Sequence, residues 1–166
     1  MDGEPLPFDV LWFEEAPNSG VITFATVGLS EHLLHYWTTG REIRQELLMT
    51  CHTTQREANI PGLLELIGKE VSLEKHGLLA GEVIGPRGPL FPGRQMTALY
   101  AAGAVYFPET MQSLVSSTGQ ETVFVWLIPI HSSEAASIAA DGWSAFEEKL
   151  VAMDPDLQDL DRDPIV

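Results

Sequence analysis

The segment Glu121–Ile130, with the sequence ETVFVWLIPI, decides the fold. From Val123 to Ile128 it carries no polar side chain, so both faces of this stretch are apolar. A strand with one wet face alternates in polarity, whereas a continuous apolar run is typical of a strand that is covered on both faces. We therefore predict a central strand here, with other strands on both sides of it.

Toward the N-terminus, three segments predict further strands. Residues 8–14 (FDVLWFE) and 21–27 (VITFATV) are rich in aromatic and β-branched side chains, and the turn formers at 17–20 favour a hairpin between them. Residues 41–50 (REIRQELLMT) come close to alternation and predict a third strand. Residues 31–39 fit either a short helix or a loop over the sheet.

The next predicted element is a helix that begins at Ile60 and ends at His76. Asn59 suits the N-cap position, and Pro61 suits the first helical turn. The apolar residues recur at helical spacing, which predicts one buried face. They are Ile60, Leu63, Leu64, Ile67 and Val71.

Glycine and proline divide the region between this helix and the central strand. Residues 81–94 predict a loop with, at most, a short strand at 82–84. Residues 95–107 predict a strand that Pro108 stops. Residues 109–119 then predict a connecting loop.

The C-terminal region predicts one helix and a tail. The helix starts at Ser132 or Ser133, and the residues of its apolar stripe are Ile138, Gly142, Phe146 and Leu150. Residues 154–166 form an acidic tail with two prolines, expected to wrap the surface or to be partly disordered. We predict a single α+β domain over residues 1–166, with its core at about 8–153. The expected sheet is mixed and mostly antiparallel, with helices packed against it.

Composition narrows the class of protein. The chain has 166 residues, of which 45% are hydrophobic, and this fits one packed domain. Cys51 is the only cysteine, so an intrachain disulfide is impossible. No apolar run approaches the ~20 residues of a membrane helix, and the start MDGEPLPFDV does not resemble a signal peptide. We expect a soluble, cytoplasmic protein with no membrane partner.

The charge balance is strongly acidic. Twenty-four Asp and Glu stand against nine Lys and Arg, a net charge of −15. Such a surface repels nucleic acid and favours the capture of a basic protein, although acidity also serves solubility alone. The stretch from His131 onward carries a net −7, so we predict a partner-binding edge there. Its candidate residues are Asp154, Asp156, Asp159 and Asp161.

Candidate chemistry is sparse. His32 with His35, and Cys51 with His52, are the local metal-ligand candidates, but no further pair has zinc-like spacing. There is no G-x-S-x-G nucleophile motif, and the loop at 81–94 lacks the phosphate-binding pattern. We therefore predict no catalytic residues, no metal and no cofactor.

Three of the four tryptophans can be given an expected place, in the core or on a binding surface. Trp12 and Trp126 lie inside predicted strands and are expected in the core. Trp37, next to Tyr36 in the unassigned segment, is a candidate exposed anchor for a protein partner. Packing in the core or under a lid is the alternative role for Trp37.

Two short motifs suggest a family. The second strand ends in T-x-GLS at residues 26–30, and the central strand ends in L-I-P-I-x-x-x-E, from Leu127 to Glu134. With the ending DLQDLDR, these segments resemble the suppressor-of-fused-like domain family over roughly residues 8–163. No binding residue can be matched to that family position by position. Glu134 falls in the first turn of the last helix, where the helix dipole favours a carboxylate, so we predict a structural role for it.

The resemblance implies a non-catalytic protein-binding module with an α/β fold. In animals, the family's named member holds zinc-finger transcription factors of the Hedgehog pathway through a short peptide strand. This chain looks like the stand-alone bacterial form, for which a role as an immunity protein against a cognate toxin is implied. A scaffold or regulatory binding protein without a toxin partner, and an enzyme with a dispersed site, are the alternatives.

Overall fold

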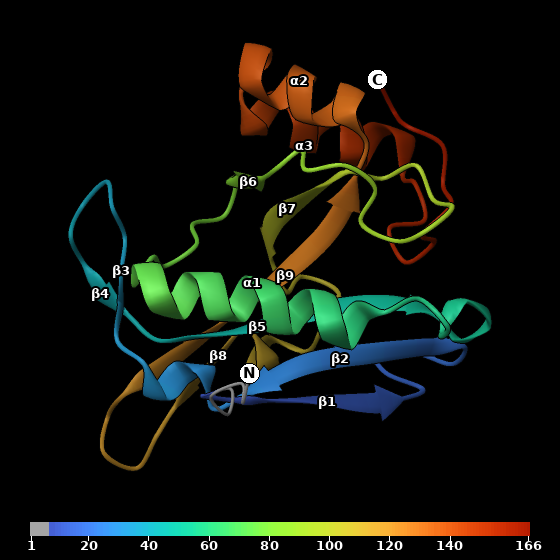
Figure 1. Cartoon of the computed structure of the whole chain (residues 1–166). Coiled ribbons are helices and arrows are strands. Elements are labelled where there is room, and N and C mark those ends of the chain that lie inside the picture. The colour runs from blue at the N-terminus through green and yellow to red at the C-terminus, as the bar shows by residue number, and fades with distance from the viewer. Residues whose placement is uncertain (1–6) are drawn as a thin grey trace, which may run out of the picture.

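A seven-stranded mixed sheet forms the centre of the computed structural model, which describes residues 7–166 (Figure 1). Its strands are β1 (Asp9–Glu14), β2 (Val21–Val27), β5 (Gln45–His52), β6 (Val83–Ile84), β7 (Ala98–Gly103), β8 (Ser113–Val115) and β9 (Glu121–Ile130). The order is β1-β2-β5-β9-β7-β6, and β8 also pairs with β9. Only β5 and β9 are parallel among the described strand pairs, so the predicted mixed, mostly antiparallel α+β fold is confirmed.

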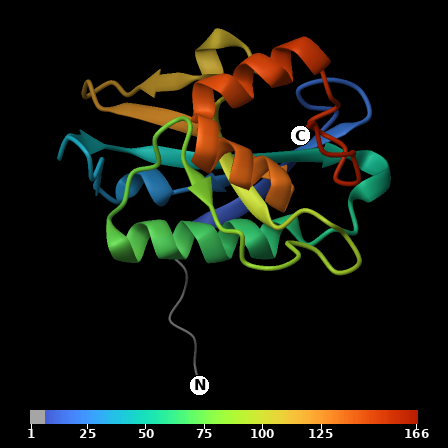
Figure 2. The same ribbon diagram turned by 90° about the horizontal axis from the view of Figure 1, so that it is seen from above.

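Helices cover both faces of this sheet (Figure 2). Helix α1 (Ile60–Glu74) packs on β1, β2 and β5, and helices α2 (Ser132–Asp141) and α3 (Trp143–Met153) contribute to the core on the other face. The predicted cap of α1 is confirmed, because the Asn59 side chain accepts a hydrogen bond of 3.1 Å from the N–H of Gly62. No helix in residues 7–166 combines the length and apolar character that crossing a membrane requires.

The strand β9 is central, as its apolar run predicted. It pairs with β5 along one edge and with β7 and β8 along the other. Val125 and Leu127 point into the core under α1, whereas Trp126 and Ile128 point into the core under α2 and α3. Burial on both faces explains why this segment lacks polar alternation.

The N-terminal hairpin and the third predicted strand are present, the latter in two parts. β1 and β2 pair antiparallel through the predicted turn. Residues 41–50 divide into the short strand β4 (Glu42–Ile43) and the start of β5, and β4 pairs with β3 (Leu34–His35) in a separate small sheet. The unassigned residues 31–39 thus supply one strand of that small sheet. The expected absence of a signal peptide rests partly on residues 1–6, which lie outside the described residues.

Two predicted boundaries near the central strand are wrong. The strand predicted at 95–107 is confined to β7, because the chain leaves the sheet after Gly103. The loop predicted at 109–119 contains a strand, β8, which pairs with the first residues of β9. Its exposed residues, such as Leu114, lack the long apolar pattern that would have marked a strand.

The single C-terminal helix predicted from the stripe is also wrong. The chain breaks at Gly142, whose φ of 88° and ψ of 161° are far from helical, and this separates α2 from α3. Glycine adopts a positive φ readily, whereas other residues are strained there. Ile138 of α2 and Phe146 of α3 are both buried, as the helical spacing predicted, but this spacing did not reveal the break between the two helices.

The C-terminal tail belongs to the packed domain. Leu157 joins the core under α2 and α3, and Leu160 joins the core under α1. Arg162 is buried as well. The predicted core limit at residue 153 is therefore too short, because apolar residues between the aspartates anchor the tail.

The motif residue Thr26 belongs to a buried polar cluster around Glu46. The Glu46 carboxylate accepts hydrogen bonds from the Thr26 hydroxyl at 2.6 Å and from the N–H groups of Gly28 and Ser30 at 3.0 Å. These bonds fix the chain where β2 turns into the short helix that follows it, Leu29–Glu31. The T-x-GLS motif is thus explained by the structure of the turn.

The second motif ends in a buried ion pair between Glu134 and Arg162. Two bonds of 2.7 and 2.9 Å join the carboxylate to the guanidinium, and the N–H of His131 donates to the same carboxylate at 2.7 Å. Burial alone would raise the pKa of Glu134, but Arg162 and two backbone N–H groups together hold this pKa below its ordinary value. The predicted structural role of Glu134 therefore goes beyond the helix dipole, since Glu134 ties the tail to α2.

Candidate functional site

The candidate metal ligands do not assemble into a site. Among residues 7–166, no group of three or more His, Cys, Asp or Glu is placed to hold a metal ion. Cys51 is fully buried, and burial followed by the nearby Glu57 raises the pKa of its thiol to about 11. At neutral pH the thiol is therefore protonated and a poor nucleophile.

Three of the four predicted partner-binding aspartates have partners within the chain. Asp156 contacts the imidazole of His52 at 2.6 Å, and Asp159 accepts a bond of 2.7 Å from the side-chain amide of Gln55. Asp161 pairs with Arg94. These contacts hold the tail against the end of β5, the short helix after it and the loop before β7, so part of the acidic charge stabilises the fold.

Asp154 differs from the other three aspartates. It caps the C-terminal end of α3, and no hydrogen bond or ion pair engages its carboxylate in the part of the chain that the structure describes. Its side chain is exposed and lines a cavity. Of the four predicted aspartates, Asp154 is therefore the one whose carboxylate remains available to a partner.

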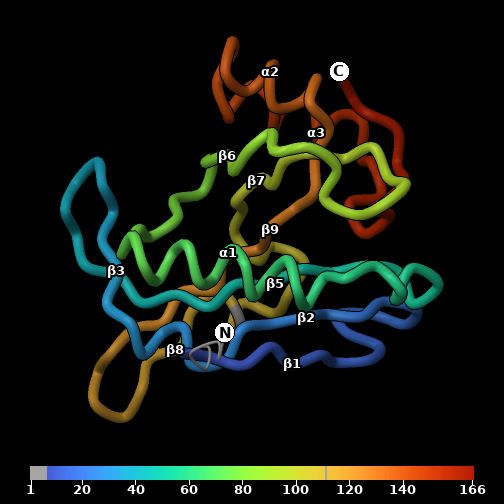
Figure 3. Tube along the Cα trace, viewed as in Figure 1, coloured from blue at the N-terminus to red at the C-terminus, as the bar shows by residue number. Residues whose placement is uncertain are grey.

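Trp37 belongs to the segment between β3 and β4, which lies on the opposite side of the molecule from the C-terminal tail (Figures 1 and 3). Its side chain is 63% exposed, and its ring stacks on His76 with 3.9 Å between ring centroids. His76 in turn contacts Glu82 at 3.1 Å. Trp37 is thus exposed, as an anchor must be, but the structure does not bring it together with the four aspartates.

Of the two tryptophans predicted for the core, one is buried and the other is exposed. Trp126 is buried as predicted. Trp12 is 60% exposed, so its predicted core position is wrong. Trp12 lies opposite Phe24 of β2, on the face of the sheet that α1 covers, but β1 is the edge strand and no described strand flanks it on its outer side.

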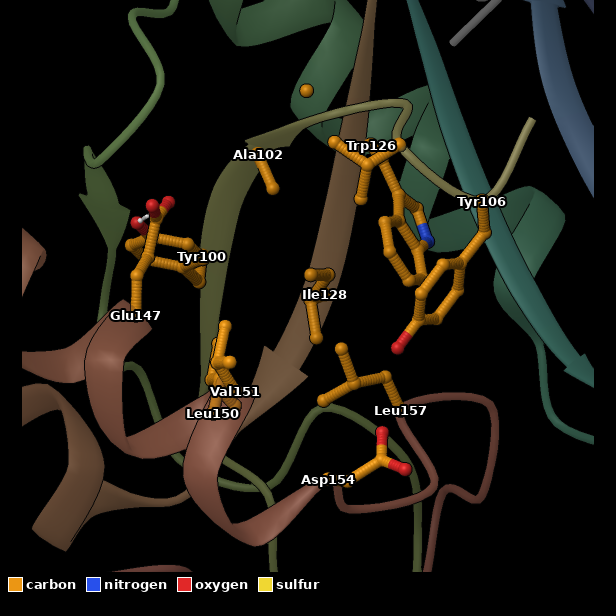
Figure 4. Close-up of a pocket in the computed structure, with 12 residues that line it drawn as sticks. Tyr100, Ala102, Tyr106, Trp126, Ile128, Glu147, Leu150, Val151, Asp154 and Leu157 are labelled. Carbon is orange, nitrogen blue, oxygen red and sulfur yellow. Dashed lines mark hydrogen bonds between the residues drawn. The ribbon is translucent and has the colours of Figure 1, made fainter. Parts of the chain in front are cut away.

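A cavity of about 410 Å³ lies over β7 and β9, bounded by α3 and by the chain that follows β7 (Figure 4). We call it the α3 cavity and define it by Tyr100, Tyr106, Trp126, Ile128, Glu147 and Asp154. Trp126 and Ile128 form its apolar floor, and Leu150 and Leu157 line its sides. A concave apolar surface with a few polar groups is the usual form of a binding site.

The polar groups of the α3 cavity are acidic or phenolic. At one end, the Tyr100 hydroxyl donates a bond of 2.7 Å to Glu147. At the other end, Asp154 lies near Tyr106, whose ring centroid is 5.0 Å from that of Trp126. Burial, then Asp154 and Asp156, raises the pKa of Tyr106. Within residues 7–166, no lysine, arginine or histidine lines the cavity.

Sequence reasoning missed most of this cavity. It singled out Asp154 but gave no role to Tyr106 or Glu147. One signal was available, because Glu147 and Asp154 are seven residues apart and so share a helix face. No sequence pattern indicated that Tyr106 lines the cavity, since its position there depends on how the chain turns back over β9.

Solved structures of suppressor of fused proteins share this fold. A suppressor of fused homologue from Neisseria gonorrhoeae matches with a TM-score of 0.69 and 14% identity, covering 96% of this chain and 88% of that one. The Sufu–Fu complex matches at 0.70 with 15% identity, covering 96% and 78%. Drosophila Suppressor of Fused matches at 0.69 with 16% identity, covering 96% of this chain but 43% of the longer one.

These matches define the class of the fold, an α+β domain that this chain shares with suppressor of fused proteins. The sequence model of the family described as Suppressor of fused protein (SUFU) matches residues 4–163, and the chain belongs to this family. The predicted resemblance is thereby confirmed. Among curated proteins, no sequence matches the chain.

Proposed function

We propose that this chain is a non-catalytic protein-binding module that captures a basic protein. The observation that carries the proposal is membership of a family whose fold binds another protein in the Sufu–Fu complex. The net charge of −15 supports a basic partner, because opposite charges speed association. The protonated thiol of the buried Cys51 supports a role without catalysis.

The proposed partner is a toxin, which this chain neutralises in the cytoplasm as an immunity protein. A suppressor of fused homologue of similar fold from Neisseria gonorrhoeae, of whose chain 88% is matched, supports comparison with the bacterial forms. A regulatory scaffold would have the same fold and acidity but a harmless partner. An enzyme with a dispersed site would act on a substrate that needs no stable complex.

Two surfaces are proposed to contact the partner. Trp37 offers a large exposed ring at one end, and Asp154 offers a free carboxylate beside the α3 cavity. Asp156, Asp159 and Asp161 also contribute negative charge, but each already has a contact within the chain. We therefore expect substitutions at Trp37 and Asp154 to affect binding with the least effect on stability.

Affinity purification followed by a growth assay tests this function. The tagged chain is purified from its host, and proteins retained by the wild type but lost in a Trp37→Ala, Asp154→Asn double variant are identified by mass spectrometry. Each retained protein is then expressed alone and together with the chain. We expect a basic protein that stops growth alone and is tolerated when the chain is present.

The alternatives give different results in this assay. A retained protein that is harmless alone would replace the toxin by a regulatory partner and favour the scaffold. No retained protein, together with turnover of a small molecule by the pure chain, would contradict the binding function. A matched control is Leu73→Ala, since Leu73 is exposed on α1 and lies outside both surfaces.

A further inference from the structure

Building on the protein-binding function above, we propose that the α3 cavity is the binding site for one arginine side chain of the partner. The guanidinium lies between Asp154 and the ring of Tyr106, and its apolar stem lies along Ile128 and Val151. The class of ligand is thus an amphipathic cation.

The charge of the cavity selects a cation. Glu147 and Asp154 both line it, and within residues 7–166 its lining includes no basic side chain. Glu147 already accepts a hydrogen bond from the Tyr100 hydroxyl, whereas the carboxylate of Asp154 has no such partner in the part of the chain that the structure describes. The raised pKa of Tyr106, which burial and then Asp154 and Asp156 produce, agrees with a negative potential at this end.

The position of Asp154 on α3 strengthens this potential. A helix C-terminus carries partial negative charge, so a cation there is stabilising and an anion is not. The last turn of α3 contains no basic residue, and the residue that caps it is the acidic Asp154. An external cation at this point would compensate both the carboxylate and the free carbonyl groups of the helix end.

The shape of the cavity suits a long side chain with a planar cationic head. Its volume of about 410 Å³ exceeds that of a single side chain, so backbone atoms of the partner also fit at its mouth. Tyr106 is 47% exposed, which leaves one part of its ring free to stack on a guanidinium. Val151 is also exposed and offers apolar surface to the stem.

The position of the two carboxylates predicts which one matters more. They are seven residues apart on one helix, which corresponds to a rise of about 10 Å. One guanidinium cannot pair with both. Because Glu147 is occupied by Tyr100, the direct contact belongs to Asp154, and Glu147 acts through longer-range attraction.

A peptide titration followed by nuclear magnetic resonance tests this site. The probe is the pentapeptide acetyl-Gly-Gly-Arg-Gly-Gly-amide, and its neutral counterpart carries citrulline in place of arginine. We expect the arginine probe to shift the Trp126 indole N–H signal and the Val151 amide signal in a saturable manner. The citrulline probe should bind about tenfold more weakly, because it keeps the shape and loses the charge.

Variants identify the contact. Asp154→Asn should weaken the binding of the arginine probe about as much as replacing its arginine by citrulline does. Glu147→Gln should weaken this binding by a smaller factor. The matched control is Glu148→Gln, which removes one charge from the same helix at an exposed position outside the cavity. Asparagine suits the positive φ of residue 154, so the first variant should fold normally.

Several outcomes would overturn the proposal. Equal binding of the two probes, an equal effect of Glu148→Gln and Asp154→Asn, or shifts that avoid Trp126 and Val151 would each do so. The titration uses no natural partner. A failed titration with a partner still captured in the growth assay would therefore reject the arginine site and leave the protein-binding function in place.

Discussion

Glu134 and Arg162 form a buried ion pair that joins the C-terminal tail to α2. Both side chains are nearly inaccessible, and Glu134 also receives the N–H groups of His131 and Ile165. Removing one member of a buried ion pair leaves an uncompensated charge, which costs far more than a surface pair contributes. The helix dipole alone, which the sequence suggested, would therefore underestimate the contribution of Glu134 to stability.

Glu134→Gln should lower the free energy of unfolding by about 3–5 kcal/mol, because Arg162 would keep its charge and lose its counter-ion. Urea unfolding measures this change. The control Glu148→Gln should fall within about 0.5 kcal/mol of the wild type, as exposed substitutions usually do. A loss below about 1 kcal/mol for Glu134→Gln would contradict the structural role.

The same pair should make stability depend on acidity. Because the pKa of Glu134 is lowered in the folded state, its contribution is present above the unfolded pKa and is lost as the pH falls through the folded value. The stability difference between the wild type and Glu134→Gln should be constant from pH 7 to about pH 5. It should shrink below about pH 4, where the carboxyl of the unfolded chain gains its proton while the folded chain still holds it ionised. An unchanged difference down to about pH 3 would refute this linkage.

Cys51 should be unreactive in the folded protein. Its side chain is fully buried, and burial raises its thiol pKa to about 11. At pH 8 a thiol reagent should label the native chain far more slowly than the chain unfolded in guanidinium. Rapid stoichiometric labelling of the folded chain would show that the thiol is exposed and would reopen the catalytic alternative.

At the scale of elements, the sheet was more accessible to sequence reasoning than the connections. The apolar run of β9, the turn after β1 and the Asn59 cap of α1 each left a local signal, and each predicted feature is present. β8 and the break at Gly142 left none, because they depend on pairing with β9 and on backbone angles. The α3 cavity shares that origin, since its walls come from segments far apart in sequence.

Gly142→Ala tests whether the break between α2 and α3 is imposed by the fold. A Cβ at this position meets no atom within 4 Å, so the cost comes from the backbone, whose φ is 88°. The variant should lose about 1–3 kcal/mol of the free energy of unfolding, with unchanged circular dichroism. Ala139→Gly, at an exposed position of α2, gives the ordinary cost of about 1 kcal/mol for a helical glycine. A more stable Gly142→Ala variant with higher helicity would mean that one continuous helix is accepted.

At the scale of the whole molecule, the acidic charge has two roles. Some of it holds the tail in place, as the contacts of Asp156, Asp159 and Asp161 show. The rest lies on exposed side chains, of which Asp141, Glu148 and Asp154 have no ion pair in the described residues. Replacing all four tail aspartates would confuse these roles, so variants at the exposed acids separate steering from stability.

The central claim, capture of a basic protein by an acidic module, is tested most directly by the association rate with the purified native partner. Stopped-flow mixing gives this rate at ~0.01 M and ~1 M salt, where the screening length falls from ~30 Å to ~3 Å. We predict that the association rate falls steeply while the dissociation rate changes less, and that Asp141→Asn, Glu148→Gln, Asp154→Asn together reproduce part of the fall. An association rate that does not depend on salt would contradict electrostatic capture and favour addition of a partner strand to a sheet edge.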